Sequence, residues 1–197
     1  QSIAFENNLS ETAYVNITSS PYLIRWFTPT VEVDLCGHAT LASARVLFDE
    51  YLPSDCSQVT FNSRKRGTLT AFKKSDMIYL DFPADQPEEV EQNNFIIEGL
   101  GEKPVKTYRG KDDYLAVFGD EDIIQTMAPD FKMLSQLDSR GLIITAPGKE
   151  VDFVSRFFSP QSGVDEDPVT GSAYTLMIPY WQGILGKKKF SAKQLSF

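Results

Sequence analysis

The sequence has 197 residues, of which 42% are hydrophobic and 12% aromatic, and this is enough for the core of one domain or of two small ones. Its formal net charge of −8 argues against a nucleic-acid partner, because little positive charge is available to neutralise phosphates. No apolar run reaches membrane-spanning length, and the two cysteines and one histidine show no zinc-type spacing and fit a reducing compartment. We therefore expect a cytoplasmic α+β protein without nucleic-acid or membrane partners.

The first part of the chain predicts a sheet with one buried helix. Residues 12–17 and 22–27 alternate in polarity, as strands do, and Ser19-Ser20-Pro21 predicts a hairpin between them. Residues 37–48 carry small or apolar side chains on most faces, which predicts a helix that is buried nearly all round. A meander of three strands is predicted over 57–62, 67–72 and 77–82.

A polar, acidic segment with two prolines, residues 83–91, is the best boundary between two halves. We predict an N-terminal half over residues 1–85 and a C-terminal half over residues 86–197. The second half is expected to hold helices and strands in alternation. They are a helix over 95–100, strands over 105–108 and 114–118, helices over 121–127 and 130–137, strands over 141–145 and 151–158, and a closing helix from 171 to about 184.

The two halves repeat one pattern, in which an aromatic strand with an arginine ends in Thr/Ser-Pro, an acidic loop follows, and a glycine starts an apolar helix. The first copy has Arg25, Glu32, Asp34 and Gly37, and the second has Arg156, Asp165, Asp167 and Gly171. Such self-similarity predicts two halves with one plan. The first N–H groups of a helix suit a bound carboxylate or phosphate, so both helix starts are predicted to face one cleft.

Four side chains near these helix starts are candidates for chemistry. His38 follows the first helix glycine, where an imidazole can donate or accept a proton. Glu11 lies at the entry to the first predicted strand, and a carboxylate in an apolar cleft can act as a general base or acid. Cys36 is either a thiolate stabilised by the helix start or a small buried hydrophobe. Asp167 is predicted to lie at the mouth of the second helix start.

Four segments of the sequence resemble the PhzF-like isomerases of phenazine biosynthesis and occur in the same order. They are Asn8-Leu9-Ser10-Glu11-Thr12-Ala13, Arg25-Trp26-Phe27-Thr28-Pro29, Leu35-Cys36-Gly37-His38-Ala39-Thr40 and Glu166-Asp167-Pro168-Val169-Thr170-Gly171-Ser172-Ala173. The resemblance implies a diaminopimelate-epimerase-like fold with two pseudo-symmetric halves, each a curved sheet around a central helix, and an active site between them. It also implies that no metal, nucleotide or flavin is needed, and it raises a homodimer as the expected assembly, because members of the family are often homodimers.

The resemblance also implies a role for each candidate. Glu11 matches the glutamate that moves a proton between carbons of a small carboxylated metabolite, and His38 and Asp167 match residues that line the site. The substrate carboxylate would be held by Ser172 and by the backbone of Gly37 and Gly171. A base and fixed donors are what proton abstraction beside a carboxylate requires.

Two departures from the family pattern and two alternative functions accompany this hypothesis. Family chains have further strands at both ends, so we expect that this sequence omits residues at each end, and the family's Gly-Ser-Ala-His run has Tyr174 in its last place. One alternative is a racemase or epimerase that uses Cys36 and a carboxylate, although the equivalent of the racemases' second cysteine is Thr170. The other is a non-catalytic protein of the same fold that binds a metabolite.

Overall fold

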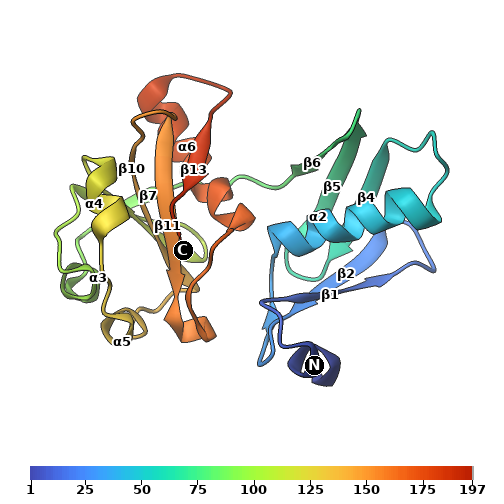
Figure 1. Cartoon of the computed structure of the whole chain (residues 1–197), viewed down its shortest axis with the longest axis horizontal. Helices are drawn as coiled ribbons and strands as arrows, with labels where there is room; N and C mark the ends of the chain where they lie inside the picture. The colour runs from blue at the N-terminus through green and yellow to red at the C-terminus, as the bar shows by residue number, and fades with distance from the viewer. Residues whose placement is uncertain (197) are drawn as a thin grey trace. The chain divides into compact units, whose positions relative to one another are not determined.

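The computed structural model describes residues 1–196, and the chain divides into two compact units after Pro83. Unit 1 covers Gln1–Pro83 and unit 2 begins at Ala84, two residues before the predicted start of the second half at residue 86. Each unit combines one sheet with helices, so the chain is α+β (Figure 1). Among the described residues, no helix is both long and apolar enough to cross a bilayer.

Unit 1 is a six-stranded sheet with the order β1-β2-β4-β5-β6 and with β3 paired to β2. The pair β2 and β4 is parallel and the other pairs are antiparallel. The strands are β1 Thr12–Asn16, β2 Tyr22–Phe27, β3 Glu32–Val33, β4 Gln58–Ser63, β5 Gly67–Lys74 and β6 Met77–Asp81. The helices are α1 Ser2–Asn7 and α2 Gly37–Val46, and α2 continues into a π-helical turn, η1 Leu47–Tyr51.

Helix α2 packs on the sheet through its smallest side chains. Ala39 and Ala44 are buried in a core that includes Trp26, and their small size lets the helix backbone approach the strands. The prediction that this helix is buried nearly all round is wrong for the described residues, because Leu41 and Val46 are 39% and 52% exposed. Helix α2 therefore buries only part of its surface on the sheet, and Leu41 and Val46 lie outside that buried part.

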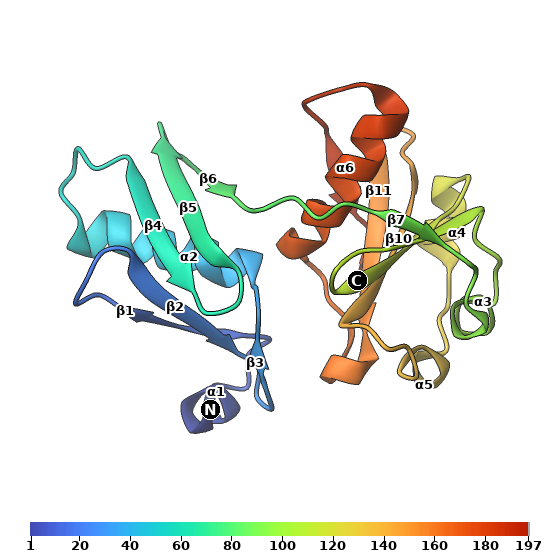
Figure 2. The same ribbon diagram turned by 180° about the vertical axis from the view of Figure 1, so that it is seen from behind.

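Unit 2 is a seven-stranded sheet with the order β12-β11-β10-β9-β8-β7 and with β13 paired to β11. Helix α6 packs on one face, and α3, α4 and α5 cover the other (Figure 2). The strands are β7 Glu88–Val90, β8 Lys106–Arg109, β9 Asp113–Val117, β10 Gly141–Pro147, β11 Phe153–Ser159, β12 Val164–Glu166 and β13 Ala192–Gln194. The helices are α3 Asn94–Leu100, α4 Glu121–Thr126, α5 Phe131–Leu134 and α6 Tyr174–Leu185, with single 3₁₀ turns at η2 Pro160–Ser162 and η3 Gly171–Ala173.

Strand β10 is buried on both faces, which explains why its sequence is apolar apart from Thr145. Leu142 and Ile144 belong to the core under α3, α4 and α5, whereas Ile143 between them belongs to the core under α6. Trp181 of α6 is 2% exposed, and its indole N–H donates a hydrogen bond to Thr145 Oγ1 at 3.1 Å. The central strand therefore fixes α6 in both packing and polar contacts.

The two units share one chain path. The elements β1, β2, β3, α2 and β4 of unit 1 correspond to β10, β11, β12, α6 and β13 of unit 2, and in each unit the helix leads to a strand parallel to the aromatic one. The arginine of the aromatic strand makes a two-pronged ion pair in both units: Arg25 with Glu32 at 2.8 and 2.7 Å, and Arg156 with Glu166 at 2.7 and 2.8 Å. The partner in the second copy is Glu166, which the sequence pattern of the repeat did not include.

Candidate active site

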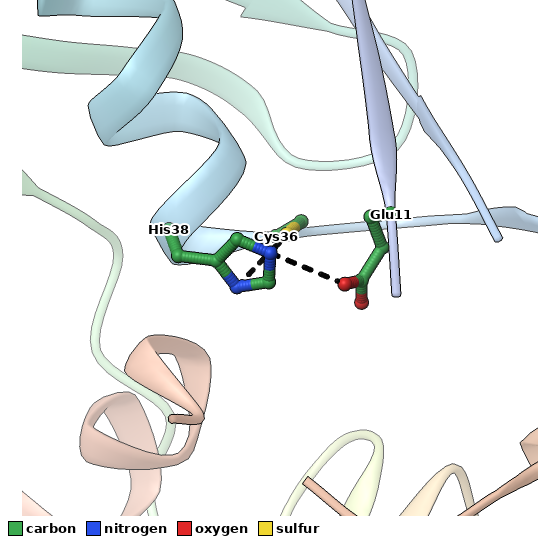
Figure 3. A group of neighbouring side chains, drawn as sticks. All are labelled: Glu11, Cys36 and His38. Carbon is green, nitrogen blue, oxygen red and sulfur yellow. Dashed lines mark hydrogen bonds and ion pairs between the residues drawn. The ribbon is translucent and has the colours of Figure 1, made fainter. Parts of the chain in front are cut away.

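Unit 1 brings three of the candidate side chains together at the ends of two elements. Glu11 directly precedes β1, Cys36 is the residue before α2, and His38 is in the first turn of α2. Figure 3 shows the imidazole of His38 close to both the carboxylate of Glu11 and the thiol of Cys36. The glycine at position 37 starts the helix as predicted, so the imidazole lies beside the first-turn N–H groups.

Short distances join the three groups. His38 Nε2 lies 3.3 Å from Glu11 Oε2, and Cys36 Sγ lies 3.7 Å from each ring nitrogen. Ser10 Oγ is 3.5 Å from the same Nε2. Glu11 Oε2 is buried and makes no hydrogen bond, although it is at ion-pair distance from the imidazole. This carboxylate oxygen is therefore close to a group that can exchange a proton and is otherwise uncommitted.

An open groove of about 500 Å³ runs between β1 and α2 and includes Glu11 and His38. Most of its other walls are apolar, among them Val15 of β1 and Ala39 of α2. Because both elements begin near Glu11 and His38, the two polar groups mark one end of a largely apolar surface. The side chain of Glu11 is 18% exposed and that of His38 is 37% exposed.

In unit 2 a tightly bonded loop precedes Gly171, which begins the 3₁₀ turn η3; the helix predicted from residue 171 begins as α6 only at Tyr174. Asp167 accepts hydrogen bonds from the Val169 N–H at 3.2 Å and from the Thr170 hydroxyl at 2.7 Å. Gln194 of β13 donates to the Asp167 carbonyl at 2.5 Å and accepts from the Thr170 N–H at 2.8 Å. These bonds hold the loop on β13, so Asp167 has a structural function here besides any contact with a ligand.

Sequence reasoning missed a partly buried arginine behind Ser172, whose side chain is 25% exposed. Arg140 donates to the Ser172 hydroxyl at 2.9 Å, and it makes a two-pronged ion pair with Asp113, including Nε to Oδ1 at 2.9 Å. Burial alone would lower the pKa of Arg140, but the charge and hydrogen bonds of Asp113 outweigh it, so the pKa lies above its ordinary value. The guanidinium therefore stays charged directly behind the start of α6.

No signal in the sequence marks this pair, since Arg140 and Asp113 are 27 positions apart. They meet because β9 and β10 are parallel neighbours in which Asp113 is paired with Gly141. The helices α4 and α5 connect these two strands and allow them to run parallel. The two charges lie side by side only because of this strand order.

The shared chain path also assigns a counterpart in unit 2 to each candidate in unit 1. Phe27 pairs with Thr12 and with Glu32, and Phe158 pairs with Leu142 and with Glu166, so the two phenylalanines are equivalent. Three further equivalent pairs follow, the first from the strand partners Thr12 and Leu142 and the other two from the aligned glycines Gly37 and Gly171. They are Glu11 with Gly141, Cys36 with Thr170, and His38 with Ser172. Unit 2 thus has no side chain at the place of Glu11, and a Cβ there would lie 2.4 Å from the Phe157 ring.

Two sheet-and-helix units with one chain path and a glycine-started helix in each define the diaminopimelate-epimerase-like class of fold. A proline racemase from Agrobacterium radiobacter has this fold, with a TM-score of 0.63 at 8% identity, covering 94% of this chain and 64% of that one. The PhzF-family protein of Enterococcus faecalis is much more similar, with a TM-score of 0.88 and 45% identity over 98% of this chain and 74% of that chain.

The chain belongs to the phenazine biosynthesis-like protein family, whose model matches residues 1–196. It is 48% identical to an uncharacterized isomerase of Pseudomonas aeruginosa over 194 residues, 98% of this chain and 74% of that protein. An uncharacterized isomerase of Halalkalibacterium halodurans is 47% identical over 199 residues, 100% of this chain and 75% of that protein. The predicted family and fold class are confirmed, and the protein is an isomerase of this family.

Proposed function

We propose that the protein is a cofactor-independent isomerase that moves a proton between carbons of a small carboxylated metabolite, with Glu11 as general acid and base. The observation that carries the proposal is the buried Glu11 oxygen that lies 3.3 Å from His38 Nε2 and makes no hydrogen bond. A carboxylate oxygen that makes no hydrogen bond with the described residues and is bordered by apolar walls is available to take a proton from carbon. His38 passes or stabilises the proton as the reaction proceeds.

The negative charge that develops beside the substrate carboxylate requires fixed donors. The backbone N–H of Gly37 begins α2, and that of Gly171 begins the 3₁₀ turn that leads into α6. Such groups at the start of a helical segment have no partner within it, which suits them to bind an anion. Ser172 adds a hydroxyl, and because Arg140 donates to its oxygen, the hydroxyl proton is free to point toward a ligand. Asp167 completes the proposed set as a residue that lines the site.

The counterparts of the candidate residues favour one base over two. A racemase of the two-thiol kind needs an acid–base group in each half, whereas the counterparts of Glu11 and Cys36 are Gly141 and Thr170. The Thr170 hydroxyl donates a hydrogen bond to the Asp167 carboxylate at 2.7 Å. A single carboxylate that removes a proton from one carbon and returns it to another fits this asymmetry.

A screen of carboxylated metabolites in D2O tests the proposal, with carbon-bound deuterium measured by mass spectrometry. The wild-type protein should label and isomerise at least one compound, and Glu11→Gln should lower the rate by about 10²–10⁴-fold without unfolding the protein. Glu6→Gln, a change at an exposed position of α1, is the matched control and should leave the rate unchanged. Full activity of Glu11→Gln would refute the role of Glu11.

The two alternatives predict different outcomes in the same assay. A racemase that depends on Cys36 would be inactivated by a thiol alkylator, and a non-catalytic metabolite-binding protein would incorporate no deuterium into any compound. We also propose that the protein acts in the cytoplasm as a homodimer, which light scattering after size exclusion would test.

A further inference from the structure

The cluster of Glu11, Cys36 and His38 has a second chemical property besides proton transfer. Its three side chains offer a carboxylate oxygen, a sulfur and an imidazole nitrogen, all within 4.8 Å of one another (Figure 3). The linear spacing of cysteine and histidine in the sequence did not predict a metal site, because the third ligand comes from the distant entry to β1.

The distances fit a tetrahedral ion. Zinc bonds of about 2.0–2.3 Å place neighbouring ligand atoms about 3.3–3.7 Å apart. His38 Nε2 lies 3.3 Å from Glu11 Oε2 and 3.7 Å from Cys36 Sγ. The sulfur and the carboxylate lie within 4.8 Å of each other, so a movement of about 1 Å closes the third edge.

Burial and orientation determine how an ion could enter. Cys36 is 4% exposed and the side chain of Glu11 is 18% exposed, whereas that of His38 is 37% exposed and borders the solvent. The sulfur is equally far from both ring nitrogens, so the imidazole must turn about its Cβ–Cγ bond to point a lone pair at the ion. The exposed ring has room for this, and a water can occupy the fourth position, as in open three-ligand zinc sites.

The donor set selects the class of ion. Thiolate and imidazole ligands favour Zn²⁺ and its transition-metal neighbours over Mg²⁺ or Ca²⁺, which prefer oxygen. The buried Glu11 oxygen that makes no hydrogen bond would gain a partner. We propose that Glu11, Cys36 and His38 bind Zn²⁺ as three protein ligands and that the bound ion blocks the proton transfer assigned to Glu11. The blocking rests on the proposed function, whereas the binding does not.

Binding is tested on the untagged protein with Co²⁺ as a spectroscopic probe and Zn²⁺ as competitor. The wild-type protein should bind one equivalent with a thiolate-to-cobalt charge-transfer absorption, which Zn²⁺ abolishes and excess Mg²⁺ does not. Cys36→Ser should lose the absorption, with Cys36→Ala as a second variant if the serine variant does not fold. Cys56→Ser is the matched control and should keep it, because the Cys56 thiol donates to the Gln58 carbonyl outside this cluster.

Glu11→Gln should weaken Zn²⁺ at least about ten-fold, because a carboxylate ligand is replaced by a neutral amide. No charge-transfer absorption in the wild-type protein, its persistence without Cys36, or its loss in Cys56→Ser would overturn the site.

Blocking is tested by deuterium incorporation with one equivalent of Zn²⁺. The rate should fall at least ten-fold and return when a chelator is added, whereas Cys56→Ser should be inhibited as strongly as the wild-type protein. If Zn²⁺ binds through Cys36 and the rate does not change, the blocking is refuted and the site stands. If metal-free Glu11→Gln keeps full activity, the proposed function fails while the binding result is unaffected.

Discussion

Arg140 offers the sharpest test of how unit 2 is held together. In Arg140→Met the side chain keeps its approximate length but loses its charge, which leaves Asp113 with only 5% of its side chain exposed and without its cation. Breaking a buried ion pair on one side costs about 3–5 kcal/mol, a large share of a typical stability of about 5–15 kcal/mol. With a urea dependence of about 2 kcal/mol/M, the unfolding midpoint of unit 2 should fall by about 2 M.

The measurement is urea unfolding followed by the fluorescence of Trp181, which is buried against β10 in the core of unit 2. A Trp26→Phe background removes the other tryptophan, which lies in unit 1. The double variant Asp113→Leu/Arg140→Met removes both charges and should recover most of the lost stability, because no charge is then left unpaired. A cost below about 1 kcal/mol for Arg140→Met, or a double variant no more stable than the single one, would refute the reasoning.

The same double variant separates stability from positioning. Even with stability recovered, Ser172 lacks the guanidinium that donates to its oxygen at 2.9 Å. We therefore expect KM for a carboxylated substrate to rise by about ten-fold, the equivalent of about 1.4 kcal/mol, with a smaller change in kcat. Added to Ser172→Ala, the double variant should have little further effect on KM. Full additivity would mean that Arg140 does not act through Ser172.

Three further results are expected. Arg156→Met should lower the free energy of urea unfolding by about 3–5 kcal/mol, because the Arg156 side chain is 3% exposed. The equivalent Arg25→Met should lower it much less, because that ion pair faces solvent. Equal losses in the two variants would contradict this. In thermal unfolding, Gly186→Ala should destabilise the protein by about 1 kcal/mol, because φ is 64° at this position. Gly183→Ala, within α6, should stabilise it by about 0.5–1 kcal/mol. A Gly186→Ala variant more stable than Gly183→Ala would be inconsistent with a helix end at Gly186. Cys36→Ala should keep most of the deuterium incorporation, and its complete loss would favour the thiol-dependent racemase.

The longer elements could be predicted because their sequence patterns are strong. The aromatic strand over 22–27 has the bounds of β2, and the helix predicted from Gly37 begins there as α2. The strands β3, β7, β12 and β13 are only two or three residues long and show no alternation, so nothing in the sequence distinguishes them from loops. The residues 83–91, predicted as the boundary between the halves, contain β7, because pairing with β8 supplies hydrogen bonds that composition does not reveal.

The candidate site was partly predictable for a related reason. Glu11, Cys36 and His38 lie beside elements with clear signals, and the structure brings the three together within unit 1. The pair of Arg140 and Asp113 depends on parallel strand order, which a single sequence does not contain. The repeat was visible as a pattern, but its loop lengths differ, so the position equivalent to Glu32 was taken as Asp165, whereas the pairing of Arg156 shows it to be Glu166.

The central claim is that one carboxylate, that of Glu11, moves a proton between substrate carbons. The most direct measurement is the rate of solvent deuterium incorporation into the identified substrate, compared between the wild-type protein and Glu11→Gln at equal folded concentration. We predict label at the carbon that receives the proton and a rate about 10²–10⁴-fold lower in the variant. An unchanged rate in Glu11→Gln, or isomerisation of the substrate by the wild-type protein with no exchange or transfer of hydrogen at carbon, would contradict the account.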